Sequence, residues 1–175
     1  MKKIIIIFLV CLLVYIIYEL FLDKKTKYLY IGNTNYSRYN LIIKENYNPK
    51  EYIEYNRDDD YRVIDLMNEI SENKQINKRG IQNLLVKSNV MVISIGKNDL
   101  ETKKELNYNY IDELLEDIDK LLKTIRKYNK DKIYFLGFYN KNSYYDYMIN
   151  KVKLICEKNG VIYIDIEIPI YKQLY

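Results

Sequence analysis

Residues 90–100 read VMVISIGKNDL, and this stretch decides the fold. Its first six residues form a continuous apolar run rich in β-branched side chains, which is typical of a strand covered on both faces of a parallel sheet. The run ends sharply at Gly96, and Lys97, Asn98 and Asp99 follow it. The stretch therefore predicts a central strand that ends in a short polar loop.

Further strands and helices alternate along the chain. Apolar residues recur at helical spacing over 63–70 and again over 81–85. The clearest helix has one apolar face from Ile111 to Ile125, with acids early and basic residues late, as the helix dipole favours. Strands are predicted at 28–31, 90–95, 132–138 and 161–166, a last helix at 145–158, and a short helix and a short strand within 36–61.

Strands separated by helices predict an α/β domain with a parallel sheet and helices on both faces. In such folds ligands bind beyond the carboxyl ends of the strands, near the point where the strand order reverses. One candidate loop follows the first strand and another follows the strand at 90–95. We expect a doubly wound order to place the first loop, from Gly32 to Asn35 and including Asn33, next to the second, from Gly96 to Asp99.

The composition indicates one globular domain. The chain has 49% hydrophobic and 30% charged residues, and its net charge of +4 comes from basic residues scattered among nearly as many acids. Nucleic-acid binding is not expected, because it needs a clustered basic stripe. Asp58, Asp59 and Asp60 lack the alternating spacing and the glycine of a calcium loop, so we interpret them as a solvated turn.

Two residue types restrict the chemistry. The cysteines are Cys11, within the N-terminal apolar run, and Cys156, so the domain can form neither an internal disulfide nor a metal-thiolate site. The chain has no histidine, which removes the usual general base, the usual zinc ligand and every Ser-His or Cys-His pair. No metal and no cofactor is expected.

The N-terminal segment has the properties of a membrane anchor. Two lysines precede an unbroken apolar run at residues 4–17, and apolar residues resume at 20–22. This segment reaches the roughly 20 largely apolar residues that a membrane span needs. A cleaved signal peptide is the alternative, but its apolar core would be shorter and followed by small residues. We therefore expect a single-pass anchor over 1–23 and one domain over 24–175.

The orientation of the anchor depends on the lysines around it. Lys24, Lys25 and Lys27 after the apolar run compete with Lys2 and Lys3 before it under the positive-inside rule. We expect the domain to lie outside the cytoplasm, at the cell membrane.

Residues 92–100, VISIGKNDL, resemble the third sequence block of the SGNH, or GDSL-type, hydrolases, which is an apolar strand that ends in Gly-x-Asn-Asp. The first predicted strand runs into Gly-Asn-Thr at residues 32–34, where that family carries Gly-Asp-Ser. The resemblance covers nearly all of residues 24–175. It implies the family's flavodoxin-like fold, with a parallel sheet between two layers of helices.

In that family the first-block serine attacks an ester carbonyl, and the third-block asparagine joins backbone amides in stabilising the oxyanion. The resemblance implies that Asn98 is the oxyanion donor, that Thr34 occupies the position of the nucleophile and that Asn33 replaces the usual aspartate. For the second-block glycine the chain offers Gly80. Ser37 is an alternative, displaced nucleophile, although a loop serine more often bonds its local backbone.

The family's base comes from a late Asp-x-x-His block, whereas this chain has no histidine and its Asp165 is expected within the last strand. Thr34 also has a stiffer and more crowded hydroxyl than serine. Two explanations stay open: a relative truncated at its C-terminus, or a divergent pseudoenzyme. Both predict little or no hydrolysis.

Three functions are compatible with these residues. The first is an SGNH-like esterase that acts on an ester such as an acetyl group on an envelope glycan. The second is a non-catalytic, membrane-tethered domain that holds a ligand or partner, which the missing serine and histidine favour. The third, a nucleotide or flavin binder, needs a phosphate-cradling loop that Gly32 alone supports poorly. Asn98 and Asp99 also have a purely structural interpretation as helix or turn caps.

Overall fold

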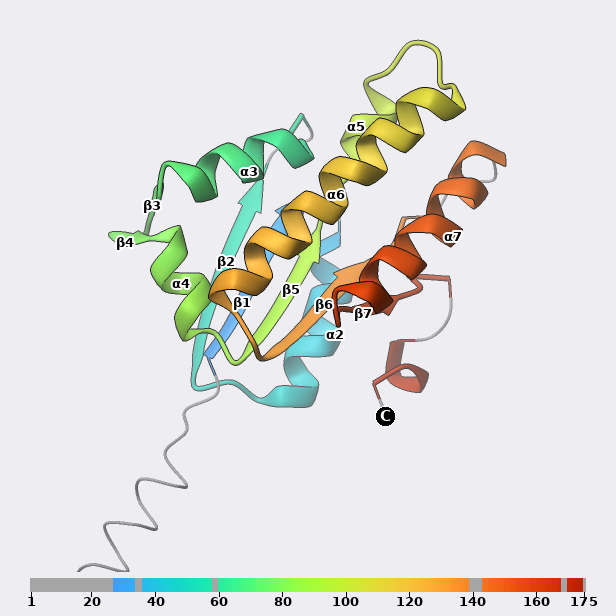
Figure 1. Cartoon of the computed structure of the whole chain (residues 1–175). Helices are drawn as coiled ribbons and strands as arrows, with labels where there is room; N and C mark the ends of the chain where they lie inside the picture. The colour runs from blue at the N-terminus through green and yellow to red at the C-terminus, as the bar shows by residue number, and fades with distance from the viewer. Residues whose placement is uncertain (1–26, 34–35, 58–59, 139–142, 168–169, 175) are drawn as a thin grey trace, which may run out of the picture.

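Figure 1 shows the computed structural model of the chain, which describes residues 27–33, 36–57, 60–138, 143–167 and 170–174. Its centre is a five-stranded parallel sheet with the strand order β2-β1-β5-β6-β7. The strands are β1 (Lys27–Asn33), β2 (Glu51–Arg57), β5 (Val90–Ser94), β6 (Lys132–Leu136) and β7 (Ile162–Ile164). The parallel sheet predicted from the alternating pattern is confirmed.

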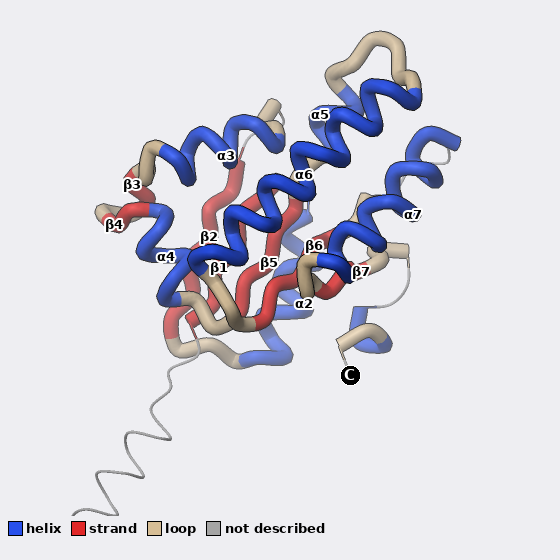
Figure 2. Tube along the Cα trace, in the orientation of Figure 1, coloured by secondary structure: helices blue, strands red, loops and turns tan. Residues whose placement is uncertain are grey.

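Helices cover both faces of this sheet, as Figure 2 shows. They are α2 (Ser37–Tyr47), α3 (Val63–Ser71), α4 (Ile81–Lys87), α5 (Lys97–Glu101), α6 (Tyr108–Tyr128) and α7 (Ser143–Lys158), with a 3-10 turn η2 (Ile170–Lys172). Helices α3, α4, α6 and α7 pack on one face, and α2 with η2 packs on the other. A short hairpin of β3 (Gln75–Ile76) and β4 (Arg79–Gly80) connects α3 to α4.

The central strands are buried on both faces because alternate side chains of a strand point to opposite sides. In β1, Leu29 and Ile31 enter the core beneath α3 and α6, whereas Tyr28 and Tyr30 enter the core beneath α2. All four side chains are at most 1% exposed. The continuous apolar runs of the sequence therefore reflect two-sided burial.

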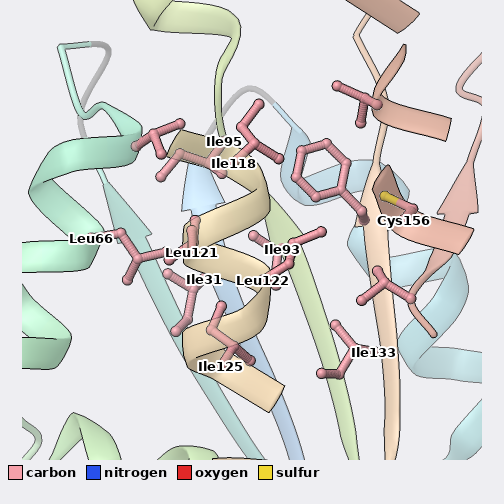
Figure 3. Packing of buried hydrophobic residues seen from close by; sticks show 14 of the residues in the cluster. Ile31, Leu66, Ile93, Ile95, Ile118, Leu121, Leu122, Ile125, Ile133 and Cys156 are labelled. Carbon is pink, nitrogen blue, oxygen red and sulfur yellow. The ribbon is translucent and has the colours of Figure 1, made fainter. Parts of the chain in front are cut away.

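Helix α6 supplies most of the cover for the larger core. Its apolar residues recur every three or four positions, and Figure 3 shows Leu121, Leu122 and Ile125 on the side that faces the sheet. The helix begins after Asn107, whose side chain accepts a hydrogen bond from the backbone nitrogen of Tyr110 at 2.9 Å. The predicted helix is confirmed.

Two local predictions are wrong. The pattern predicts a loop over 96–99, whereas the structure has the single-turn helix α5, since Gly96 allows the chain to turn directly from β5 into a helix. The last strand ends at Ile164, so Asp165 lies after it and not within it. The backbone of Asp165 bonds a side chain instead of a neighbouring strand: its nitrogen donates to Gln173 at 2.8 Å, and its oxygen accepts from Gln173 at 2.7 Å.

The predicted anchor over residues 1–23 lies outside the described residues. Within the part of the chain that the structure describes, no helix combines the length and the hydrophobicity that crossing a bilayer requires. The single-pass anchor stays a prediction from the sequence.

Replacing Leu122 by alanine should lower the free energy of unfolding by about 2–5 kcal/mol, because this side chain of α6 is fully buried in the core. Leu154→Ala is the matched control, since Leu154 is 61% exposed on α7. The control should change the free energy by less than about 0.5 kcal/mol. Urea unfolding followed by circular dichroism measures both values, and equal losses would contradict the placement of α6.

Candidate functional site

The order of the strands reverses beside β1. From β1 the chain passes through α2 to β2 on one side, and it later crosses to β5 on the other side. The carboxyl ends of β1 and β5 therefore flank a topological switch point, which is where α/β folds of this kind bind ligands.

Two asparagines join the end of β1 to α5 at the switch point. Asn33, the last residue of β1, donates from Nδ2 to Oδ1 of Asn98 at 3.1 Å. Asn98 in turn donates from Nδ2 to the backbone oxygen of Tyr61 at 2.9 Å. Both asparagines are 5% exposed. The expected neighbourhood of the two loops is confirmed, and bonds at both ends fix the direction of the Asn98 amide.

Backbone geometry requires glycine at two positions beside these asparagines. A Cβ atom on Gly32 would lie 2.5 Å from the backbone oxygen of Ser94, which is closer than any real contact. Gly96 has a φ of +101°, a conformation that other residues rarely adopt, and it turns the chain from β5 into α5. Both glycines therefore shape the site whatever its chemistry is.

Asp99 connects the same loop to α3. Its two carboxylate oxygens lie 3.4 and 3.2 Å from the backbone nitrogen of Val63, which belongs to the first turn of α3 and has no acceptor within that helix. The hydroxyl of Tyr110 donates to the backbone oxygen of Asp99 at 2.8 Å. Burial raises the pKa of Asp99 to about 6. Asp99 thus has the structural role of a helix cap.

Thr34, the predicted nucleophile, lies outside the described residues. Asn33 precedes it directly, so the described part of the site ends one residue before it. Ser37, the alternative nucleophile, is the first residue of α2. The identity of the nucleophile stays a prediction.

Gly80 does not belong to the site. It lies in β4 beside Arg79, and Arg79 forms an ion pair with Glu51, the first residue of β2. The amino end of β2 is the edge of the sheet opposite the switch point, so the assignment of Gly80 as the second-block glycine is wrong. Tyr61, after β2, reaches Asn98 instead. Sequence reasoning missed this contact, because a backbone acceptor leaves no side-chain pattern.

A polar cavity of about 480 Å³ borders Tyr61. Several of its charged residues pair with one another, for example Arg62 with Asp65 at 3.8 Å and Glu69 with Lys74. Within the described ranges, no group of three His, Cys, Asp or Glu side chains is placed to hold a metal ion. The cavity is lined by Arg57, Asp60, Tyr61, Arg62, Asp65, Asn68, Glu69, Lys74 and Thr102.

A scan against protein-family models finds no match, and a search of curated protein sequences finds none either. Several solved structures share the fold. The acetyl xylan esterase AlAXEase aligns with a TM-score of 0.55 and 12% identity, over 78% of this chain and 76% of that chain. The psychrotrophic esterase EstA from Pseudoalteromonas sp. aligns with a TM-score of 0.55 and 11% identity, over 79% and 77%.

A family two carbohydrate esterase from Clostridium thermocellum aligns with a TM-score of 0.57 and 15% identity, over 79% of this chain and 53% of that chain. At such low identity the likeness establishes the fold alone. The chain has the parallel α/β fold of these esterases, with helices on both sides of the sheet.

The Asn33–Asn98 bond should be measurable by a double-mutant cycle. Asn33→Ala, Asn98→Ala and the double variant should give a coupling energy of about 1 kcal/mol in urea unfolding, because one buried hydrogen bond links the two side chains. A second cycle with Asn98 and the exposed Asn150 of α7 should be additive within about 0.5 kcal/mol. Additivity in both cycles would mean that the two loops are not joined.

Asp99 should make stability depend on pH. Its pKa in the folded protein is raised to about 6 from an ordinary value of 3.8, so the folded state retains the proton to higher pH than the unfolded chain does. This contribution is fully present below about pH 4 and is lost as the pH rises through about 6. Asp99→Asn keeps an acceptor for Val63 and removes the titration.

The free energy of unfolding of the wild type, minus that of Asp99→Asn, should therefore fall by on the order of 2 kcal/mol between pH 4 and pH 7.5. Urea unfolding of both proteins across this range measures the difference, in which other titrating groups cancel. A difference that is constant, or that grows with pH, would show that Asp99 is not a buried acid.

Proposed function

We propose that this chain is an SGNH-type domain that binds acyl esters, such as acetylated glycans, at the switch point and hydrolyses them slowly or not at all. The observation that carries the proposal is the position of Asn98. It follows β5 at the switch point and is held beside the end of β1 by Asn33. The esterase fold supports the same class of ligand.

The hydrogen bonds of Asn98 suit an oxyanion donor. A side-chain amide has two N–H hydrogens, and one of them is directed to the backbone oxygen of Tyr61. No acceptor for the second hydrogen is seen among the described residues. Because Oδ1 accepts from Asn33, the amide cannot rotate to present its oxygen to a ligand without breaking that bond. The donor is therefore preorganised, which is the requirement for stabilising a developing oxyanion.

The groups that accelerate turnover are weak or missing. The chain has no histidine to take a proton from a nucleophile. Asp99, the buried acid next to Asn98, accepts a hydrogen bond from the backbone nitrogen of Val63 and so caps α3. Threonine at position 34 is a crowded nucleophile. These features favour binding without efficient hydrolysis, and they equally support a non-catalytic interaction domain as the second candidate.

We further propose that the domain is attached to the cell membrane through residues 1–23 and lies outside the cytoplasm. The support is the apolar run at 4–17 and 20–22, which has the length of a membrane span.

Hydrolysis and binding should be measured on the full chain in a mild detergent. With an aryl acetate, the wild type should release little product above buffer, and Thr34→Ser should increase the rate by up to about tenfold only, because no base is supplied. Turnover by the wild type that Thr34→Ala or Asn98→Ala abolishes would instead establish an efficient, rewired esterase. Asn150→Ala is the control for a surface asparagine.

Binding of an acetylated oligosaccharide, followed by calorimetry, tests the ligand class. Asn98→Ala should weaken it by about tenfold, which is the contribution of one hydrogen bond, whereas Asn150→Ala should leave it unchanged. If the folded wild type binds acetylated and deacetylated oligosaccharides equally or not at all, the site does not recognise acyl esters.

A further inference from the structure

The edge of the sheet opposite the switch point is rich in basic residues. Lys27 and Glu51, the first residues of β1 and β2, pair with each other there. Val90 and Lys132, the first residues of β5 and β6, pair at the same edge. We call this surface the basal face and define it by Lys27, Lys50, Lys87, Arg126, Lys130 and Lys132.

Three lysines of the basal face have no carboxylate partner among the described residues, although the face also includes the acids Glu51 and Asp131. Lys87, Lys130 and Lys132 are exposed, and within the described residues none of them forms an ion pair with a carboxylate. The amine of Lys132 lies 3.3 Å from the hydroxyl of Tyr47. The acid Glu51 is already paired with Lys27 at 3.5 Å and with a second cation, Arg79. An anionic surface could therefore approach this face without displacing internal ion pairs of those three lysines.

Stabilisation of helix ends accounts for only part of the basal face. Basic residues in the last turn favour a helix, and this explains Lys87 in α4 and Arg126 in α6. It also explains Lys130, whose ammonium donates to the backbone oxygen of Arg126 in the last turn of α6. It does not explain Lys50, which directly precedes β2, or Lys132, the first residue of β6. The cations come from separate segments of the chain, so only the folded domain brings them together.

The basal face is also where the N-terminal segment joins the domain. β1 begins at Lys27, and the apolar residues 4–17 and 20–22 precede it in the sequence. The link from residue 23 to Lys27 can span at most about 14 Å. A charge interaction in physiological salt reaches about 8 Å, so an inserted anchor would hold the basal face within or close to that range of the bilayer surface.

We propose that the basal face binds the anionic lipid headgroups of the membrane that holds the N-terminal segment. This inference rests on the proposed membrane attachment and goes beyond it, because attachment alone leaves the domain free to rotate on its link. Binding through the basal face turns the switch point, at the opposite edge of the sheet, away from the bilayer and toward ligands in the surrounding solution.

The test uses the full chain in lipid nanodiscs of phosphatidylcholine, with or without phosphatidylglycerol. Amine-reactive labelling followed by mass spectrometry compares Lys50 and Lys87 on the basal face with Lys103 and Lys104, which follow α5 near the switch point. In the anionic discs the basal lysines should react on the order of fivefold more slowly relative to Lys103 and Lys104. In about 1 M salt, where the screening length is about 3 Å, this protection should disappear.

Two charge-reversal variants with the same change in net charge make the test specific. Lys130→Glu with Lys132→Glu should abolish the protection of Lys50 and Lys87, whereas Lys103→Glu with Lys104→Glu should preserve it. Because the second variant lacks the reference lysines, protection in both variants is measured as the ratio of the Lys50 and Lys87 labelling rates between the two kinds of disc. Circular dichroism checks that each variant is folded. Equal relative labelling in the two lipids would overturn the basal-face proposal while leaving attachment intact. Failure of the protein to copurify with either kind of disc would overturn attachment itself, and the inference with it.

Discussion

The pairing of β1 with β5 is the constraint on which the rest of the structure depends. Gly32 and Ser94 approach so closely that one added methyl group would lie 2.5 Å from the Ser94 backbone oxygen. Both strands are buried on both faces, so helices must cover both sides of the sheet. Because β1 also pairs with β2, the chain has to cross from one side of β1 to the other. That crossing creates the switch point at which Asn33 and Asn98 meet.

The polar groups around the switch point form one connected network. Asn98 bonds the backbone oxygen of Tyr61, and the hydroxyl of Tyr61 donates to Oε2 of Glu69 at 2.6 Å. Glu69 is 6% exposed and is paired with Lys74. A buried carboxylate needs such partners, because an isolated buried charge is strongly unfavourable. The position of Asn98 therefore depends on α3 and on residues well away from the switch point.

The fold of this chain does not by itself establish its chemical activity. The esterases that share its fold are only 11–15% identical to it, and one fold can host many activities. At the switch point the described residues provide an amide held at both ends, Gly32 in close contact with Ser94, Gly96 at a positive φ, and a polar cavity nearby. The chain has no histidine, and threonine occupies position 34, where the sequence resemblance predicts a nucleophile.

The sequence by itself determined the parallel α/β architecture, helix α6 and the polar ends of β1 and β5. These features depend on neighbouring residues: helical spacing of apolar side chains predicts a helix, and a continuous apolar run predicts a strand buried on both faces. Only the tertiary structure decided the partners: Asn98 bonds the Tyr61 backbone across 37 positions, and Asp99 caps α3 across 36. The tertiary structure also shows that Gly80 is not part of the site, since this glycine follows α3 and lies at the opposite edge of the sheet. In these contacts a side chain bonds a backbone atom that is distant in the sequence. Because every residue has such backbone atoms, no pattern of residue types predicts which of them will be the partner.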